Sequence, residues 1–307
     1  MLRLGGVVDV RGSNGSVPGR LILMRRLLAM ACVLSCLPWG VVSAKEIFVD
    51  NLVGSDAFDG LRNLPGDGGG GPVRTLRRAM QVAGFADQIV LTRPGAVYYD
   101  SLSLTGARNS GTKQNPFTLI GNGAILSGLR AVPPEGWRPA GPELWKLTLT
   151  RKGYYRLLRD GHPLPEARSE NGVNPLSTLA AGEWAAWQGS VYFRSDGNPP
   201  STQQFAYSAD QTGLSLYQVD NVRIVDVTFR DFRFDGINAQ NMCDGVTLEN
   251  VTCINNGRAG LAVSGASHVD MVGGRVTGNG RHQVRITRPA GAELRDVTLD
   301  GEPTVVP

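Results

Sequence analysis

The sequence has 307 residues, a formal net charge of +4 and only 19% charged side chains. The first 44 residues hold this surplus, because they carry five arginines against a single acid, Asp9. Removing them from 31 basic and 27 acidic residues leaves 26 of each, so the charge gives no indication of nucleic-acid or membrane-surface binding.

A segment typical of a secretory signal peptide begins at Met24. Two arginines are followed by an apolar stretch from Leu27 to Leu37, and a run of small residues ends at Ala44. The stretch is too short to span a membrane. We therefore expect residues 1–23 to be an over-extended start, and cleavage after Ala44 to give a secreted or periplasmic protein with no membrane span. Acylation of Cys36 in a lipoprotein is the alternative.

Residues 45–128 predict one amphipathic helix among short strands. The helix is expected within residues 74–84, where the apolar residues share one face. The expected strands are Glu46–Asp50, Asp87–Leu91, Tyr98–Leu104, Phe117–Gly121 and Ala124–Gly128.

A loop rich in Asp and Gly follows the first strand. Asp56 and Asp59 offer carboxylates to a Ca²⁺ ion, but such loops are common as simple turns. We predict no cofactor, and calcium stays an unsupported alternative.

Residues 129–212 predict an inserted all-β module. They hold four of the five tryptophans and have turn sequences at Asp160-Gly161 and Asp196-Gly197. Trp184 and Trp187 are candidates for stacking on sugar rings, and the alternative is that the tryptophans fill the core of a small module.

Residues 213–307 repeat. Segments that begin at Val222, Val246, Val269 and Ala292 align without gaps, and their starts are 24, 23 and 23 residues apart. A period of this length predicts stacked units that share one core.

Two solenoid folds compete for this period. The first half of each repeat fits leucine-rich repeats, but the second half alternates apolar residues beside glycines, as in Gly236–Ala239 and Gly260–Val263. Glycines there would cost a helix about 1 kcal/mol each. We therefore predict three short strands per turn and an all-β fold, a right-handed parallel β-helix. The helix at 74–84 would cap its N-terminal end.

Two sets of turn residues support stacked corners. Residues that tolerate a left-handed backbone recur at aligned positions, and the asparagines among them are expected to form hydrogen-bonded ladders. The first set is Asp226, Asn250, Gly273 and Asp296, and the second is Asn255, Asn256, Gly278 and Asn279.

Four N-terminal motifs resemble secreted bacterial right-handed β-helix proteins of the pectate-lyase-like superfamily. They are F-V-D-x-x-x-G-S-D-x-x-D-G from Phe48, G-P-x-R-T-L-x-x-A from Gly71, D-x-I-x-L-x-x-x-G-x-x-Y from Asp87 and P-F-T-L-I-G-x-G-A-x-L-S-G from Pro116. The superfamily includes polysaccharide lyases and glycoside hydrolases, so the resemblance implies a polysaccharide partner. These motifs belong to the cap and the rungs, and they specify no active site.

Aligning the rungs predicts a cationic column. Arg258 lies over Arg281, and His282 is next to Arg281. Asn238 and Arg285 share an outward column on the adjoining strand, and Asp231 and Asp235 lie one rung earlier. Arginines one rung apart repel unless an anion lies between them, and the carboxylate of an acidic sugar is such an anion.

A uronate lyase needs a group that neutralises the carboxylate, a base and an acid. Arg258, Arg281, His282 and Arg285 are the candidate catalytic residues, with Asp231, Asp235, Asn238, Trp184 and Trp187 as candidate substrate contacts. The alternative is that the arginines only pair with Asp231 and Asp235. His162 and His268 receive no role, and no zinc-spaced set of ligands or other metal site is predicted.

The sequence thus predicts a monomer that interacts with a polysaccharide, as a lyase or glycosidase on an acidic glycan. A non-catalytic carbohydrate-binding or surface protein is the alternative, and whether the chain is an enzyme stays open.

Overall fold

The computed structural model describes residues 44–150, 153–169 and 172–307, and residues from Ala44 to Pro307 form one compact unit. The expected signal peptide lies outside the described residues. Among the helices that are described, none has the length and apolar character needed to cross a bilayer.

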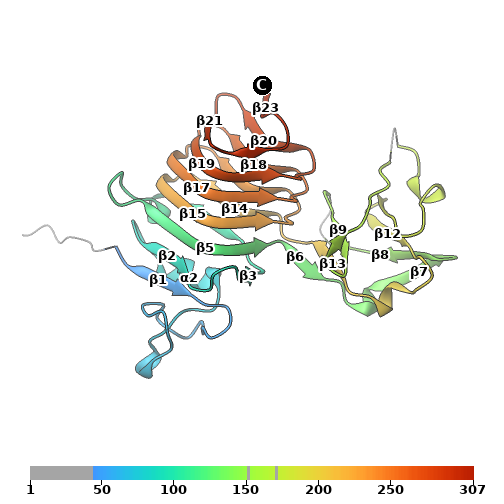
Figure 1. Cartoon of the computed structure of the whole chain (residues 1–307), viewed down its shortest axis with the longest axis horizontal. Coiled ribbons are helices and arrows are strands. Elements are labelled where there is room, and N and C mark those ends of the chain that lie inside the picture. The colour runs from blue at the N-terminus through green and yellow to red at the C-terminus, as the bar shows by residue number, and fades with distance from the viewer. Residues whose placement is uncertain (1–43, 151–152, 170–171) are drawn as a thin grey trace, which may run out of the picture. The chain divides into compact units, whose positions relative to one another are not determined.

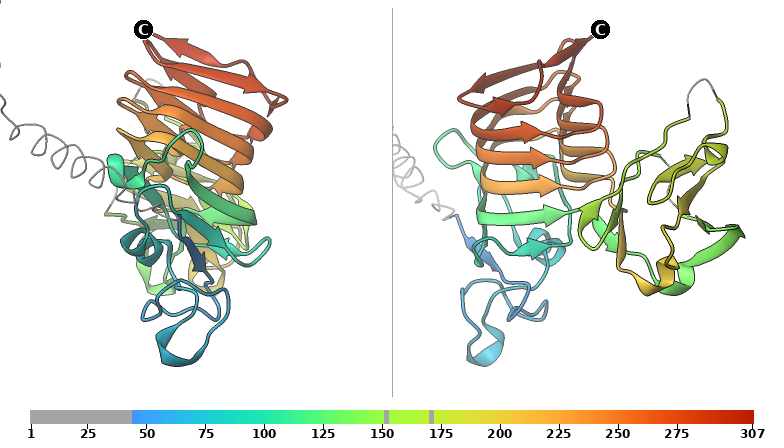
Figure 2. Two further views of the ribbon diagram at one scale, coloured as in Figure 1. Left: turned by 90° about the vertical axis from the view of Figure 1, so that its left-hand side faces the viewer. Right: turned by 45° about the vertical axis from the view of Figure 1, so that its right-hand side comes forward.

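Two parallel sheets wind into a coil of stacked rungs (Figures 1 and 2). The first sheet has nine strands, β1 (Glu46–Val49), β2 (Gln88–Leu91), β3 (Val97–Tyr98), β5 (Phe117–Ser127), β15 (Asp220–Arg230), β17 (Asp244–Ile254), β19 (His268–Thr277), β21 (Gly291–Arg295) and β22 (Thr298–Leu299). The second has six, β4 (Leu102–Thr105), β14 (Thr212–Tyr217), β16 (Asp235–Gln240), β18 (Ala259–Ser264), β20 (His282–Thr287) and β23 (Thr304–Val306).

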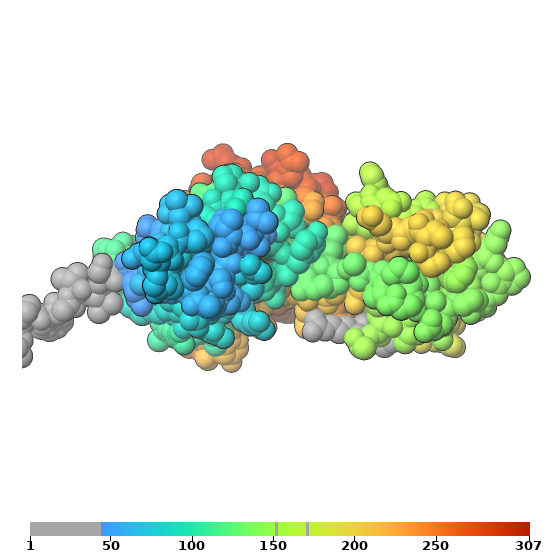
Figure 3. Space-filling view, turned by 90° about the horizontal axis from the view of Figure 1, so that it is seen from below, coloured from blue at the N-terminus to red at the C-terminus, as the bar shows by residue number. Residues whose placement is uncertain are grey.

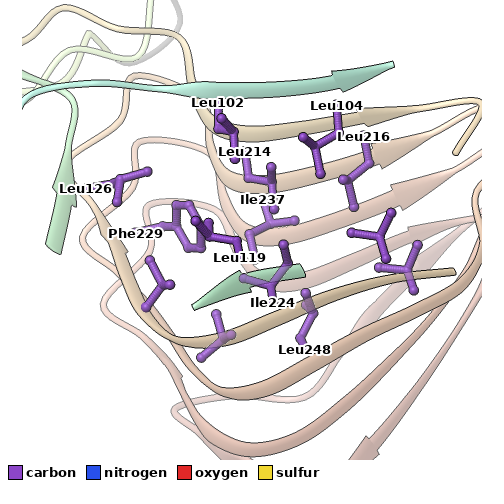
Figure 4. Close-up of a cluster of buried hydrophobic side chains, with 14 of the residues drawn as sticks. Leu102, Leu104, Leu119, Leu126, Leu214, Leu216, Ile224, Phe229, Ile237 and Leu248 are labelled. Carbon is purple, nitrogen blue, oxygen red and sulfur yellow. The ribbon is translucent and has the colours of Figure 1, made fainter. Parts of the chain in front are cut away.

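The predicted register is confirmed residue by residue. Ile224 pairs with Leu248, Leu248 with Met271, and Met271 with Leu294. The labelled apolar side chains point into the space that the two sheets enclose (Figure 4). Most are fully buried, so each rung continues the core of the rung before it. No helix lies between the paired strands of this region, which excludes the leucine-rich-repeat alternative.

The corners bend the strands. Asp226, Asn250, Gly273 and Asp296 all have positive φ, between 50° and 69°, as the aligned turn residues predict. Each of these residues lies inside or directly after a strand rather than in a loop. The prediction of three short strands per turn was therefore wrong in detail: in β15, β17 and β19 the first two are one long strand bent at this residue, and they are separate only in the last rung, as β21 and β22.

The asparagine ladder at the second corner is confirmed. The Nδ2 of Asn256 donates to the Oδ1 of Asn279 at 2.9 Å, and the same Oδ1 accepts the backbone N–H of Asn256. The Oδ1 of Asn256 in turn accepts the N–H of Phe232. These buried amides satisfy main-chain groups that the corner removes from the sheets.

The helix α2 (Leu76–Val82) covers the N-terminal end of the coil, as predicted, and is shorter than the expected 74–84. Thr75 caps it, because its side chain accepts from the N–H of Arg78. Leu76 and Ala79 are fully buried against the first rung. Short 3-10 turns occur at η1 (Asp67–Gly69), η2 (Ala107–Asn109), η3 (Pro134–Gly136), η4 (Pro175–Ser177) and η5 (Pro200–Thr202).

The inserted module contains two antiparallel sheets of four strands. One holds β6 (Leu129–Ala131), β9 (Leu157–Arg159), β10 (His162–Pro163) and β13 (Phe205–Ser208), and the other holds β7 (Trp137–Gly141), β8 (Leu144–Leu147), β11 (Trp184–Trp187) and β12 (Ser190–Arg194). Trp137, Phe193 and Phe205 meet in its core, with ring centroids 5.0 to 6.0 Å apart. The module therefore has a hydrophobic core of its own.

Candidate functional site

The module meets the coil through an aromatic contact. Tyr154 of the module lies 4.9 Å from Phe234 between ring centroids, at an interplanar angle of 59°. Phe234 directly precedes β16, so it stands at a corner of the coil. Seen from below, the module forms the green and yellow body next to the coil (Figure 3). The predicted arginine column lies on the same corner.

Arg258 is bound to a carboxylate. Its Nε and Nη2 donate to the two oxygens of Asp235, at 2.9 and 2.5 Å, and Asp235 is completely buried. This bidentate pair raises the pKa of the Arg258 guanidinium, and the Phe234 ring covers the same group at 5.2 Å. Arg258 and Asp235 therefore satisfy each other within the fold. This agrees with the alternative that the arginines of this column pair with Asp231 and Asp235.

Arg281 is placed differently from Arg258. The register puts it one rung above, where its N–H donates to the Arg258 carbonyl. Its guanidinium lies over the Tyr154 ring at 4.8 Å, and no ion pair joins it to any carboxylate of the described residues. An exposed cation held on an aromatic face stays available to an anionic ligand.

A cleft of about 530 Å³ opens beside Arg281, between the module and the coil. We call it the arginine cleft. The coil contributes Gly257, Gly280 and Arg281, and the module contributes Gly153–Leu157, Pro163, Leu164, Glu166–Ser169, Trp184 and Ala186.

The charges in the arginine cleft are unbalanced. Its described lining carries Arg156, Arg168 and Arg281 against Glu166 alone. Arg168 already holds Glu166, with 3.0 Å between Nε and Oε2. Burial lowers the pKa of the Arg156 guanidinium, while Asp231 and Glu166 act to raise it. The Nε of Arg156 is buried and has no hydrogen-bond partner among the residues that the structure describes. A carboxylate entering this cleft would compensate that charge.

A second cleft of about 810 Å³ lies against the same junction and contains Asp231. We call it the Asp231 cleft. Its walls are mainly apolar, with Leu129, Val132 and Phe205 among them. Asp231 is only 4% exposed and lies 3.4 Å from the Nε of Arg230. Burial raises the pKa of its carboxyl, although Arg230 and Arg156 act to lower it.

Three further predicted residues lie away from both clefts. The His282 Nδ1 is 3.1 Å from the Thr304 hydroxyl, and burial together with the nearby arginines lowers the pKa of its imidazole. Arg285 lies on the outer face of β20, opposite Ala262. Asn238 lines a separate polar hollow with Ser103 and Gln240. The structure therefore brings Arg258, Arg281 and His282 to one corner, and only Arg281 of them lines a cleft.

The two candidate tryptophans have structural positions. Trp184 is 2% exposed, and its indole N–H donates to the Leu164 carbonyl at 3.1 Å. This burial leaves no free face for stacking on a sugar, which corrects the role suggested for Trp184. Trp187 ends β11 at the hairpin with β12 and is half-buried outside both clefts.

The loop proposed for calcium uses its carboxylates for the chain itself. Asp56 accepts the N–H groups of Arg74 and Thr75, and Asp59 accepts those of Leu61 and Gly71. The bonds of Asp56 join the loop to the start of α2, and those of Asp59 hold the loop to itself and to Gly71.

The contribution of the module to the site was missed by the sequence analysis. Tyr154, Arg156 and Glu166 lie in a segment without periodicity, so no column predicted that they would meet Arg281. The signal that exists is compositional, the cationic and aromatic run of residues 151–159.

A comparison with family models gives the fold its name. Residues 205–301 match the family described as "Right handed beta helix region". The chain is a right-handed parallel β-helix. This bears out the predicted fold class.

Two solved structures are similar to this β-helix. One, titled "The complex structure of XylC with xylose", has a TM-score of 0.54 and 10% sequence identity, covering 83% of this chain and 57% of that one. The other, titled "Glycoside hydrolase", has a TM-score of 0.54 and 13% identity, covering 79% of this chain and 67% of that one. The chain thus spans little more than half of the first structure. No curated protein matches the sequence.

Proposed function

We propose that this β-helix binds an acidic polysaccharide where the module meets the coil, with a sugar carboxylate in the arginine cleft. The observation that carries the proposal is the excess of arginines in its described lining, where the guanidinium of Arg281 rests on the Tyr154 ring and the Nε of Arg156 lacks a hydrogen-bond partner among the described residues. Guanidinium groups bind carboxylates through paired hydrogen bonds, which are stronger than those between neutral groups.

The other groups in the arginine cleft suit a sugar ring. Tyr154 lines it beside the arginines and is partly exposed, and an aromatic ring can present an apolar face to the C–H groups of a sugar. The titles of the two similar structures, which mention xylose and a glycoside hydrolase, agree with a carbohydrate ligand.

The geometry favours binding over elimination. A lyase needs a base close to the sugar carbon that loses its proton. His282, one of the candidate catalytic residues, is not part of the described lining of the arginine cleft, and its Nδ1 lies 3.1 Å from the Thr304 hydroxyl. Glu166, the carboxylate that the described lining does contain, is paired with Arg168.

Hydrolysis in the Asp231 cleft is a second candidate. A carboxyl with a raised pKa in an apolar cleft is suited to act as a general acid. Glycoside hydrolysis normally uses two carboxyl groups, about 5 to 10 Å apart. Asp231 is the single carboxyl group among the described lining residues, which ranks this candidate below binding.

The test is a titration of the purified protein with oligomers of a uronic acid and with their carboxyl-reduced, neutral forms. We expect binding of the acidic oligomers alone, weakened by salt. Arg281→Ala should reduce the affinity at least tenfold, since a hydrogen bond to a charged group contributes about 1.5–3 kcal/mol. Arg275→Ala is the matched control, an exposed arginine on the outer face of β19, and should bind normally.

Three results would overturn the binding proposal. Equal affinity of the wild type and Arg281→Ala would place the ligand elsewhere. Release of unsaturated, ultraviolet-absorbing products would show a lyase, and release of reducing ends that Asp231→Asn abolishes would favour hydrolysis.

Secretion is part of the same proposal, because polysaccharides of this kind lie outside the cytoplasm. Mass spectrometry of the protein expressed from its full gene tests it, and we expect a mature chain that begins at Lys45.

A further inference from the structure

Three side chains with metal-binding groups gather on the outer face of the last rungs. His268 and Asp270 are two residues apart on β19, so they point to the same side of the sheet. Glu293 on β21 lies directly opposite Asp270 in the parallel register. The cluster of His268, Asp270 and Glu293 therefore comes from two adjacent rungs of a rigid ladder.

The donor atoms of this cluster are close together. The Nε2 of His268 is 3.5 Å from the Oδ1 of Asp270. One donor atom from each of the three residues fits within 4.8 Å of the other two. Ligands around one zinc ion lie about 3–4 Å apart, given bonds of about 2.0–2.2 Å. His268 and Glu293 are exposed, so their side chains can rotate to close the difference.

The charges on this face change along the coil. In the preceding rungs, Arg223 on β15 donates two hydrogen bonds to Glu249 on β17, of 2.7 and 2.5 Å. In the last rungs Asp270 and Glu293 stand in register as like charges, which is unfavourable without a cation between them. Arg295 approaches Glu293 at 3.7 Å, and Asp270 has no basic partner but His268 in the described parts of the chain.

The space around the imidazole is provided by a glycine. Gly291 lies opposite His268 on the next rung, and a Cβ added there would meet the Nδ1 of His268 at 2.9 Å. Any other residue would displace the ring. The rung thus accommodates the imidazole beside the two carboxylates.

We propose that His268, Asp270 and Glu293 bind a divalent transition-metal ion, for which Zn²⁺ is the probe. One imidazole and two carboxylates are ligands that this class of ion accepts, and exposure leaves positions for water. The bound ion joins β19 to β21 and neutralises the two facing acids. Because it binds only the folded rungs, it stabilises the C-terminal end of the coil. The proposal is independent of the arginine cleft.

The experiment measures Zn²⁺ binding by calorimetry and thermal unfolding on the metal-free protein. We expect one ion per chain at this cluster and a rise in Tm with added ZnCl₂. His268→Gln should weaken binding at least tenfold and remove the rise in Tm. His162→Gln is the matched control, since His162 is an exposed histidine of the module bonded to the Asp160 carbonyl, and it should behave like the wild type.

Glu293→Gln provides a second variant, because an exposed side chain is replaced by one of equal size. We expect weaker Zn²⁺ binding from it as well. Unchanged stoichiometry and affinity in both His268→Gln and Glu293→Gln would overturn the proposal, as would the absence of any binding by the wild type.

Discussion

The coil and the inserted module build their cores in opposite ways. In the coil the same position recurs every rung, so Phe229 lies over Cys253 and Cys253 over Val276. In the module Phe205 meets the rings of Trp137 and Phe193 edge to face, and nothing repeats. One core is extended by adding rungs, and the other is closed.

This difference assigns separate tasks to the two regions. The coil supplies a rigid ladder that sets the spacing of Arg258 and Arg281. The module supplies Tyr154 and Arg156, which turn one corner of that ladder into a cleft. The proposed ligand site therefore requires both regions, and variants that separate them test the account.

The largest effect is expected from the coil core. Phe229→Ala should lower the free energy of unfolding by about 3–5 kcal/mol, because a fully buried ring leaves a cavity between rungs. Thr252→Ala, on the outer side of the adjacent strand, should change it by less than about 0.5 kcal/mol. Denaturant titration followed by circular dichroism measures both. Equal effects would contradict a core shared along the rungs.

The module is expected to lose its structure separately. Phe193→Ala removes a fully buried ring from the module core, with a local cost of about 3–5 kcal/mol. Hydrogen exchange should then accelerate in β8, β11 and β12 while the amides of β15 and β17 stay protected. Acceleration in both regions would show that the two cores unfold as one.

The asparagine ladder should contribute less than an apolar rung. Asn256→Ala leaves the N–H of Phe232 without its acceptor, and a buried unsatisfied group costs about 1–3 kcal/mol. Asn238→Ala, on the outer face of β16, is the control and should be near neutral. Thermal melts distinguish the two variants. If Asn256→Ala melted at the same temperature as the wild type, the ladder would not contribute to stability.

The smallest effects are expected from single carboxyl groups, and Asp231 in the coil is the first of two. Because its pKa is raised in the folded protein, its carboxyl favours folding at low pH, and this contribution is lost as the pH rises above the unfolded value of about 3.9. Asp231→Asn should thus be more stable than the wild type at pH 7, with the difference vanishing in acid.

Asp196 in the module gives the opposite sign. Its hydrogen bond with Arg159 lowers the pKa of Asp196, so its contribution is present at neutral pH and is lost as the pH falls. Asp196→Asn should lower stability at pH 7 and leave it unchanged in acid. Unfolding curves of both variants between pH 3 and pH 7 check the two signs, and parallel curves would contradict them.

The sequence predicted the coil well for a physical reason. In a parallel ladder, residues one period apart are neighbours on adjacent rungs. Aligning Ile224 with Leu248 therefore predicts that the two are in contact. The positions with positive φ could also be predicted, since Asp226 and Asn250 are residue types that tolerate this conformation. What the alignment missed is that the strand continues through this bend.

The site was predicted only in part because half of it is not periodic. The alignment correctly placed Arg258 and Arg281 in one column. It did not show that Asp235 pairs with Arg258 or that the Tyr154 ring lies under Arg281. The first contact comes from a different position of the neighbouring rung, and the second comes from the module. The burial of Trp184 likewise follows from packing that composition does not reveal.

The central claim is that coil and module together bind a sugar carboxylate in the arginine cleft. A crystal structure of the protein with a bound uronic-acid oligomer tests it most directly. We predict a carboxylate within hydrogen-bond distance of Arg281 and Arg156, with a sugar ring against Tyr154. An oligomer bound instead beside His282 and Arg285, or confined to the Asp231 cleft, would contradict the account.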